Sequence, residues 1–591
     1  MEFTFQVATE SPNPGTSPRP TITCTAPARP DMPGLPRPGP RWYVPPMLGL
    51  SFRNEVLAAA AILALAALVR VGVAARNPMP AGDGVASELE MARNLLDGRG
   101  WSTQRKWILY DPSTAALRPE GNRQPAMSVL LALAFLVSGV SFRTAQAVSL
   151  LLGIGALLAA WWWARRTFGR AAALASLAWL SLDPVMIWFS TQPDSLLLFT
   201  ALFFVILASF SGSEPTIRVS VLAGLLSGVS YLARTQGLVL GMSLGLWVLL
   251  RGGRGRLARA AVFSAAFTAV ALPWFLRNAD AFGTPLYSQN GQFLLNENHW
   301  AAWEVRDSAP GPSDMLRHGG APAVARALAA GVFRVLEPLT IGTLHRGEVF
   351  GWPPLILLTA SALIALRNRG TRSRMVLPAF ASIPMAASLV LHEHAARYLL
   401  FMTTVVACLG FAGATGITDA LGLDRRWRTV LAAVAALLLV RPLAAVLGSD
   451  TRARAEEAAE MSRWISEHSR PDDWVVTFPG VELMIWDYRR PTLTMPNDYE
   501  MLLWPCLEEH GVRFVLIDPD VPVMRPRLSS RWRVAPDGSG WEVVDPPPFL
   551  TEVHRSSSGR TIVYEWTGTV PEGFMYVDSL PRDNCRALPP G

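Results

Sequence analysis

The stretch that decides the fold is VLAAAAILALAALVRVGVAA, from Val56 to Ala75, followed by a polar loop that begins NPMPAGDG, from Asn77 to Gly84. A run of roughly 20 apolar residues is the length that a helix needs to cross a bilayer. A carboxylate held next to such a run is costly unless water, a cation or a substrate shares its site. Asp83 is therefore the first candidate for a functional residue.

The composition is that of a membrane protein. Half of the 591 residues are hydrophobic, 17% are charged and the mean hydropathy is +0.26, which is too apolar for a soluble enzyme. A net charge of +7 would suggest nucleic acid as a partner of a soluble protein. Here the arginines cluster in short loops between apolar runs, a pattern that reports membrane topology. We expect the lipid bilayer as a partner and no nucleic acid.

The apolar runs predict a mainly α-helical, polytopic transmembrane bundle of about 11–13 spans. They lack the alternation of a barrel strand, and only helices satisfy their own backbone within lipid. A run near 126–140 is short for a full crossing, and we interpret it as an interfacial or half-crossing helix. The expected spans lie near 56–75, 126–140, 143–163, 171–190, 194–210, 218–234, 235–250, 258–276, 350–367, 374–391, 397–421 and 429–448.

Three domains are expected. Residues 1–50 are rich in Pro and predict a disordered cytoplasmic tail. Residues 51–449 form the membrane domain, with large external loops at 76–125 and 277–349. Residues 450–591 predict a soluble α/β domain, with a helix at Arg452–His468, strands at Trp474–Phe478 and Val512–Ile517, and a hairpin at Val553–Trp566. Arginine-rich loops near 165–170, 251–259, 367–374 and 425–428 are expected in the cytoplasm, which places both large loops and the last domain outside.

Each large loop carries an amphipathic pattern. In the first, Ser87 and Glu90 have the spacing of a capping box, and the helix should run along the membrane surface until Gly98. Asp83 would then precede its first turn. In the second, the expected apolar stripe consists of Val324, Leu328, Val332 and Leu336. Two such helices would cover a cavity at the outer face.

Several motifs resemble those of GT-C glycosyltransferases, the superfamily of the protein mannosyltransferase, aminoarabinose transferase and RgtA/B/C/D-like families. The resemblance covers roughly residues 55–420, and its most specific part is Pro-Trp-x-x-Arg-Asn followed by Phe-Gly-x-Pro. The motifs are Gly82-Asp83, the run from Leu96 to Trp101, Arg123-Gln124-Pro125, Tyr231–Arg234, Leu272–Asn278 with Phe282–Pro285, and Arg397-Tyr398.

The resemblance implies a GT-C fold and an inverting transfer of a monosaccharide from a polyprenyl-phosphate donor at the extracytoplasmic face of the cell membrane. The acceptor is a lipid, a glycan or a protein. The first-loop acid, here Asp83, would act as a base or a metal ligand. The family often has a second acid next to it, but Gly84 stands there, so Glu88 is ranked as the second acid for its proximity, ahead of Glu90 and Asp111.

The departing lipid phosphate needs positive charge, and a guanidinium matches two phosphate oxygens at once. The residues expected to bind it are Arg123, Arg234, Arg277, Arg397 and Tyr398. The metal ligands are unknown, and a divalent cation, Mg²⁺ or Mn²⁺, is left open. His392, Glu393 and His394 form a polar turn more readily than a metal site.

Alternatives remain at this point. Each arginine near a span end, Arg70 included, can instead extend to lipid headgroups. Cys506 and Cys585 either pair, if the last domain is extracytoplasmic, or remain unrelated thiols. For the whole chain, the rivals are a secondary transporter or lipid flippase, which should show inverted repeats, and a membrane scaffold without catalytic activity.

Overall fold

A computed structural model describes residues 52–81, 83–106, 115–210, 215–251, 255–289, 312–340, 353–391, 396–422, 425–477, 489–496, 498, 500–518, 521, 525, 528, 531–534, 541–543 and 546–571. The expected N-terminal tail, Asp111, His392, Glu393, His394 and Cys585 lie outside these residues. Of Asp83 the structure describes the backbone and not the side chain.

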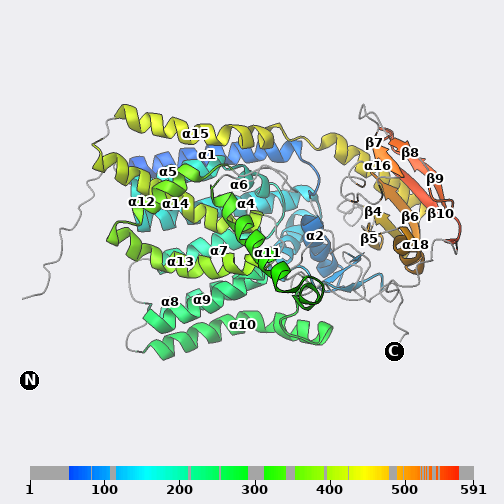
Figure 1. The fold of residues 1–591 in the computed structure, drawn as a ribbon, viewed down its shortest axis with the longest axis horizontal. Helices are drawn as coiled ribbons and strands as arrows, with labels where there is room; N and C mark the ends of the chain where they lie inside the picture. The colour runs from blue at the N-terminus through cyan, green and yellow to red at the C-terminus, as the bar shows by residue number, and fades with distance from the viewer. Residues whose placement is uncertain are drawn as a thin grey trace, which may run out of the picture. The chain divides into compact units, whose positions relative to one another are not determined.

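Apolar helices dominate the described chain, as the sequence predicts (Figure 1). Six helical segments are long and apolar enough to cross a membrane, and shorter apolar helices accompany them. Large apolar side chains of α1 point outward, including Leu57, Leu65 and Leu68, which are more than half exposed. A helix that shows such residues to its surroundings is placed in lipid. The long segments are Phe52–Arg76 (α1), Phe142–Phe168 (α4), Arg256–Phe282 (α10), Arg369–Val390 (α13), Arg397–Thr418, most of it in α14 (Leu400–Ala420), and Ala432–His468, which joins α15 (Arg425–Gly448) and α16 (Arg452–His468).

The bundle packs around α7 (Leu196–Ser209), in which ten of the 14 residues are buried and none is exposed. Helix α4 packs along α7, and α8, α9 and α10 lie side by side (Figure 1). The remaining helices are α3 (Pro125–Ser138), α5 (Arg170–Leu182), α6 (Pro184–Phe189), α8 (Ile217–Ala233), α9 (Gln236–Arg251), α11 (Pro312–Thr340), α12 (Ile356–Ala365) and the short η3 (Ala396–Leu399).

One expected span is interrupted. The run at 171–190 forms two helices, α5 and α6, because the Asp183 side chain accepts the backbone N–H of Met186 and starts α6. The preceding α1 helix stabilises this break. Arg70 of α1 is fully buried and donates to the Ser190 hydroxyl at 3.0 Å and to the Ser181 carbonyl at 2.9 Å. Arg70 therefore holds the end of α6 in place and does not extend to lipid headgroups.

The first external loop contains α2 (Asp83–Leu96) and three short strands, β1 (Ser102–Thr103), β2 (Arg105–Lys106) and β3 (Arg118–Pro119). The helix starts four residues before the expected cap, so Ser87 is not its N-cap but a buried residue of its interior. Nor does α2 lie on a surface. Leu89 and Ala92 pack on Met127 and Leu131 of α3, and its other side faces the rest of the loop. Helix α2 is buried because both of its faces have partners.

The expected stripe of the second loop is also displaced. In α11 the buried residues include Ala323, Val335 and Leu339, whereas Val332 and Leu336 are about half exposed. The helix turns a different face to α13 because Gly331 approaches the backbone of Val390, where only a glycine fits. In a membrane protein an apolar stripe in the sequence does not show which side of a helix packs on protein, because an apolar face can also contact lipid.

The C-terminal part contains a six-stranded mixed sheet in the order β2-β5-β4-β6-β10-β9. Strands β5 and β6 run parallel to β4, and β10 is antiparallel to β6 and β9. Cys506 is disulfide-bonded; since Cys585 is not described, their pairing stays a prediction. The elements are β4 (Trp474–Thr477), β5 (Thr492–Thr494), α18 (Glu500–Glu509), β6 (Val512–Ile517), β9 (Leu550–Arg555) and β10 (Ile562–Trp566), with β7 (Trp532–Val534) and β8 (Trp541–Val543) as a separate pair.

Candidate active site

The first turn of α2 carries Asp83 and Gly84. A Cβ atom built on Gly84 would overlap the guanidinium of Arg123, at its Nη2 and Cζ atoms. Arg123 lies just before α3, where Glu120 accepts the backbone N–H groups of Asn122 and Arg123 and shapes the turn. Gly84 therefore leaves the space in which a guanidinium packs, one residue away from Asp83.

A second wall of the site is the buried loop between α6 and α7. Its Asp194 is 7% exposed and accepts the backbone N–H of Leu196 at 2.7 Å. Asp194 also forms an ion pair with Arg234, with Nη1 and Oδ1 2.8 Å apart. The same nitrogen of Arg234 is 3.2 Å from the Ser195 hydroxyl. Because this loop leads directly into the central α7, the carboxylate is held by the most buried part of the bundle.

Arg234 is positioned by the break between α8 and α9. Its backbone is extended (φ −152°, ψ 143°) and ends α8. The turn closes with a hydrogen bond from the Gly237 N–H to the Arg234 carbonyl at 2.8 Å. A Cβ on Gly237 would overlap backbone atoms of Ser230 and Tyr231, so this tight turn requires a glycine. The boundary between the expected spans 218–234 and 235–250 is thus a turn that directs Arg234 toward Asp194.

The third wall is η3, with Arg397 and Tyr398. The guanidinium carbons of Arg234 and Arg397 lie 4.8 and 5.4 Å from the centre of the Tyr398 ring, within the range of cation–π contacts. The Arg397 guanidinium also lies 6.0 Å from the Phe189 ring. Both guanidiniums therefore contact the same electron-rich ring.

Glu88 completes this group of residues from α2. It is 1% exposed and accepts a hydrogen bond from the Ser128 hydroxyl at 2.7 Å. Burial raises the pKa of Glu88 to about 8, against the opposing effects of Ser128 and Arg123. Burial also acts on Asp194, but Arg234, Arg123 and Arg397 outweigh it and lower its pKa. At neutral pH, Asp194 is thus the ionised carboxylate and Glu88 retains its proton.

The site therefore brings together five of the predicted residues, from segments far apart in the sequence: Glu88, Arg123, Arg234, Arg397 and Tyr398. Asp194 was not predicted. Its signal in the sequence is an acid within the apolar stretch from Val185 to Phe210, which is costly in a membrane unless it is paired.

Arg277 lies elsewhere. Its guanidinium donates to the carbonyls of Glu120 at 2.7 Å and Trp101 at 2.8 Å and stacks near the Trp274 ring. No contact among the described residues joins it to Asp194 or Arg234. These hydrogen bonds attach α10 to the loop that carries Arg123, and phosphate binding by Arg277 stays a prediction.

The Phe-Gly-x-Pro motif contributes to the same support. Phe282 stacks on Tyr287, with ring centres 4.0 Å apart, and both rings lie against Gly121. Gly283 adopts a left-handed conformation (φ 73°) that ends α10. The most specific motif of the sequence therefore fixes the first loop from outside the site.

A divalent cation would need several carboxylate or imidazole ligands. Within the described part of the chain, no group of three His, Cys, Asp or Glu side chains is arranged to hold a metal ion. Asp194 already accepts hydrogen bonds from Arg234 and Leu196, and Glu88 is neutral near pH 7.

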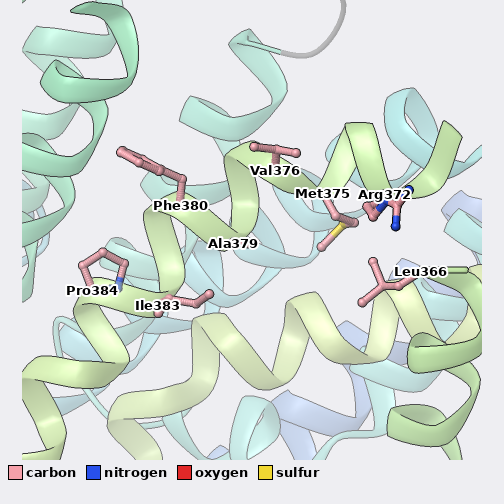
Figure 2. Close-up of a pocket in the computed structure, with 8 residues that line it drawn as sticks. All are labelled: Leu366, Arg372, Met375, Val376, Ala379, Phe380, Ile383 and Pro384. Carbon is pink, nitrogen blue, oxygen red and sulfur yellow. The ribbon is translucent and has the colours of Figure 1, made fainter. Parts of the chain in front are cut away.

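An apolar groove lies along α13 and is separate from this site (Figure 2). None of its lining residues belongs to the group around Asp194. They are Leu366, Arg372, Met375, Val376, Ala379, Phe380, Ile383 and Pro384.

Comparison with known proteins identifies the class. The family model of dolichyl-phosphate-mannose-protein mannosyltransferases matches residues 122–276, which include Arg123, Asp194 and Arg234. No curated protein sequence matches the chain significantly.

Among solved structures, the oligosaccharyltransferase AglB from Archaeoglobus fulgidus, in complex with an inhibitory peptide and a dolichol-phosphate, has a TM-score of 0.53 at 15% identity over 84% of this chain and 75% of that chain. The same enzyme with Zn and sulfate gives 0.51 at 14% identity over 80% and 71%. ArnT from Cupriavidus metallidurans, bound to undecaprenyl phosphate, gives 0.49 at 14% identity over 88% and 100%.

The described helices and the structural matches define a polytopic membrane protein with a GT-C fold. Within this fold, residues 122–276 match the mannosyltransferase family model.

Proposed function

We propose that the chain transfers a monosaccharide from a polyprenyl-phosphate donor to an acceptor lipid, glycan or protein at the extracytoplasmic face of the membrane. Asp83 takes the proton of the acceptor hydroxyl as its oxygen bonds to the anomeric carbon. The bond from that carbon to the phosphate oxygen breaks, and the lipid phosphate leaves with the electron pair. Direct displacement of this kind inverts the anomeric configuration.

The observation that carries the proposal is the convergence of Arg123, Arg234 and Arg397 on a single ionised acid, Asp194. With Glu88 neutral, three positive charges and one negative charge leave an excess of two positive charges in a largely buried site. An ionised Asp83 would reduce this excess to +1. An excess of positive charge in a buried site favours the binding of an anionic ligand.

A leaving phosphate supplies that anion. The donor is a phosphodiester with one negative charge, and the charge on the phosphate grows as the bond to the sugar breaks. Guanidinium groups that the fold already holds in place stabilise the transition state more than the bound donor, because the phosphate carries more negative charge in the transition state. Arg234 and Arg397, which both contact the Tyr398 ring, are the residues proposed for this role, and Arg123 packs at Gly84, the residue after Asp83.

The extracytoplasmic location is supported by the arginine-rich loops. Arg165, Arg166 and Arg170 lie at the junction of α4 and α5, where Arg165 and Arg170 pair with the buried Glu55 near the start of α1. If this end faces the cytoplasm, as the positive-inside rule predicts, α1 leads to the first loop on the opposite side.

A transfer assay tests the function. Purified protein in lipid nanodiscs receives radiolabelled polyprenyl-phosphate sugars and candidate acceptors, with and without EDTA followed by Mg²⁺ or Mn²⁺. We expect Asp83→Asn to lower transfer by about 100- to 10,000-fold, the range for loss of a general base, whereas Asp450→Asn, at an exposed pair with Arg452, retains it.

Two outcomes would contradict the proposal. Movement of the lipid-linked sugar across the bilayer without a new glycosidic bond would indicate a flippase. Full transfer by Asp83→Asn would remove this carboxylate from the reaction.

A further inference from the structure

The first external loop contributes a strand to the sheet of the C-terminal domain. Strand β2 pairs in parallel with β5, with Arg105 opposite Thr492 and Lys106 opposite Leu493. The Thr492 N–H donates to the Gln104 carbonyl at 2.9 Å. A strand added to the edge of a sheet gains backbone hydrogen bonds that do not depend on its sequence. The sheet is therefore built from two parts of the chain nearly 400 residues apart.

Side chains secure this strand. Lys106 is 1% exposed, and its Nζ lies 2.7 Å from Nε2 of His510. Nδ1 of His510 is 2.8 Å from the Cys506 carbonyl, which places the ring proton on Nδ1 and leaves Nε2 to accept from the lysine. An ion pair of 3.0 Å between Asp97 and Arg489 joins the same two parts of the chain.

Hydrogen bonds connect this strand to α2. Glu90 accepts from the Thr103 hydroxyl at 2.7 Å and from the backbone N–H of Gln104. Asn94, one turn further along α2, donates to the Ser102 carbonyl at 2.8 Å. Buried hydrogen bonds to a carboxyl group are costly to break without replacement. Helix α2 is thus attached to the residues that directly precede the docked strand.

We propose that the C-terminal domain positions α2, because the docking of β2 on β5 is transmitted through Glu90 to the helix turn that begins with Asp83. The inference rests on the proposed function and assigns Glu90 as a positioning residue. Its direct neighbours among the charged groups are Arg105 and Glu120.

A chemical property of the sequence makes the docked state measurable. Lys106 is the only lysine in the chain. Acetylation of the full-length protein in nanodiscs, followed by mass spectrometry, therefore reports this site, with the same protein unfolded in guanidinium chloride as the reference. We expect Lys106 to react at least about tenfold more slowly in the folded protein than in the unfolded protein, because a buried group reacts only when the structure opens locally.

Two variants separate the docking of β2 from its effect on α2. The first, His510→Ala, removes the acceptor of Lys106 and should make the lysine reactive. Two controls should keep Lys106 protected: His510→Gln, which offers another acceptor, and His468→Ala, at an exposed histidine of α16. Glu90→Ala should leave Lys106 protected while hydrogen exchange in residues 83–90 increases.

His510→Ala and Glu90→Ala should each lower kcat by about tenfold to a hundredfold at an unchanged KM for the donor. This is the range expected when a reacting group is misplaced. Glu90→Gln, which retains one acceptor oxygen, should recover most of the loss.

The proposal is overturned if Lys106 reacts as fast in the folded wild type as in the unfolded protein, or if His510→Ala exposes it without a change in the exchange of α2 or in kcat. The labelling and exchange measurements need no sugar donor. They remain decisive if the proposed transfer itself is not found.

Discussion

At the scale of single residues, the site depends on which buried charges have partners. Asp194 is ionised because three guanidiniums act on it, whereas Glu88, held by a hydroxyl, is neutral at pH 7. The sequence places acids and arginines near the same face of the membrane but does not show these pairings. Asp194 was missed for that reason, and Glu88 was selected for proximity alone.

Gly84→Ala is predicted to lower activity by moving Arg123. The new methyl group would overlap the guanidinium, which is the flexible end of a side chain and can shift, so the protein should still fold. We expect kcat to fall about tenfold to a hundredfold, since a displaced catalytic group costs this much. Gly72→Ala, at a helical position with open space around it, is the matched control. Activity equal to that of the control would show that Arg123 need not occupy this place.

Glu88 should make the protein less stable at alkaline pH. Its pKa is raised from 4.5 to about 8 in the folded state, so its contribution to stability is fully present below about pH 4.5 and is lost as the pH rises through about 8. Thermal unfolding in nanodiscs should show a melting temperature that falls over this range in the wild type and falls less in Glu88→Gln. Part of the slope will remain, because burial also raises the pKa of Glu90, to about 7. Identical slopes would mean that Glu88 is ionised at neutral pH.

At the scale of helices and strands, length and hydrophobicity were sufficient for most of the prediction. The apolar runs at 218–234 and 235–250 correspond to α8 and α9, and the hairpin at Val553–Trp566 corresponds to β9 and β10. The predictions fail where the local sequence pattern does not show which residues are buried by tertiary packing. The capping-box spacing at Ser87 suggested a helix start, but tertiary packing extends α2 back to Asp83.

Gly237→Ala should destabilise the turn between α8 and α9. The added Cβ meets backbone atoms, which cannot move aside, so we expect a loss of about 1–3 kcal/mol or more in the free energy of unfolding. Gly155→Ala in α4 has open space around it and should be neutral or stabilising by up to about 1 kcal/mol. Thermal unfolding of both variants gives the comparison. Equal melting temperatures would show that the turn tolerates a side chain.

At the scale of the whole molecule, a helical scaffold places charged groups from four segments at one end of α7. The resemblance noted in the sequence covered the membrane domain, and its motifs divide into two sets in the structure. Arg123, Arg234, Arg397 and Tyr398 line the site, whereas Arg277 and the Phe-Gly-x-Pro motif hold the first loop. Sequence alone does not make this division, because an arginine that binds phosphate and one that binds carbonyl groups look the same in a motif.

The long-range links were also beyond a reading of local patterns. A two-residue strand such as β2 has no periodicity, and its place in the C-terminal sheet follows from pairing with residues far along the chain. The salt bridge between Asp194 and Arg234 is a contact of the same kind.

An experimental structure of the full-length protein in nanodiscs, with a polyprenyl phosphate bound, tests most directly whether these arginines form the phosphate site. We expect the phosphate within hydrogen-bonding distance of Arg234 and Arg397, on the side of the site that faces Asp83. A phosphate bound at another place, with both guanidiniums still paired only within the protein, would contradict it.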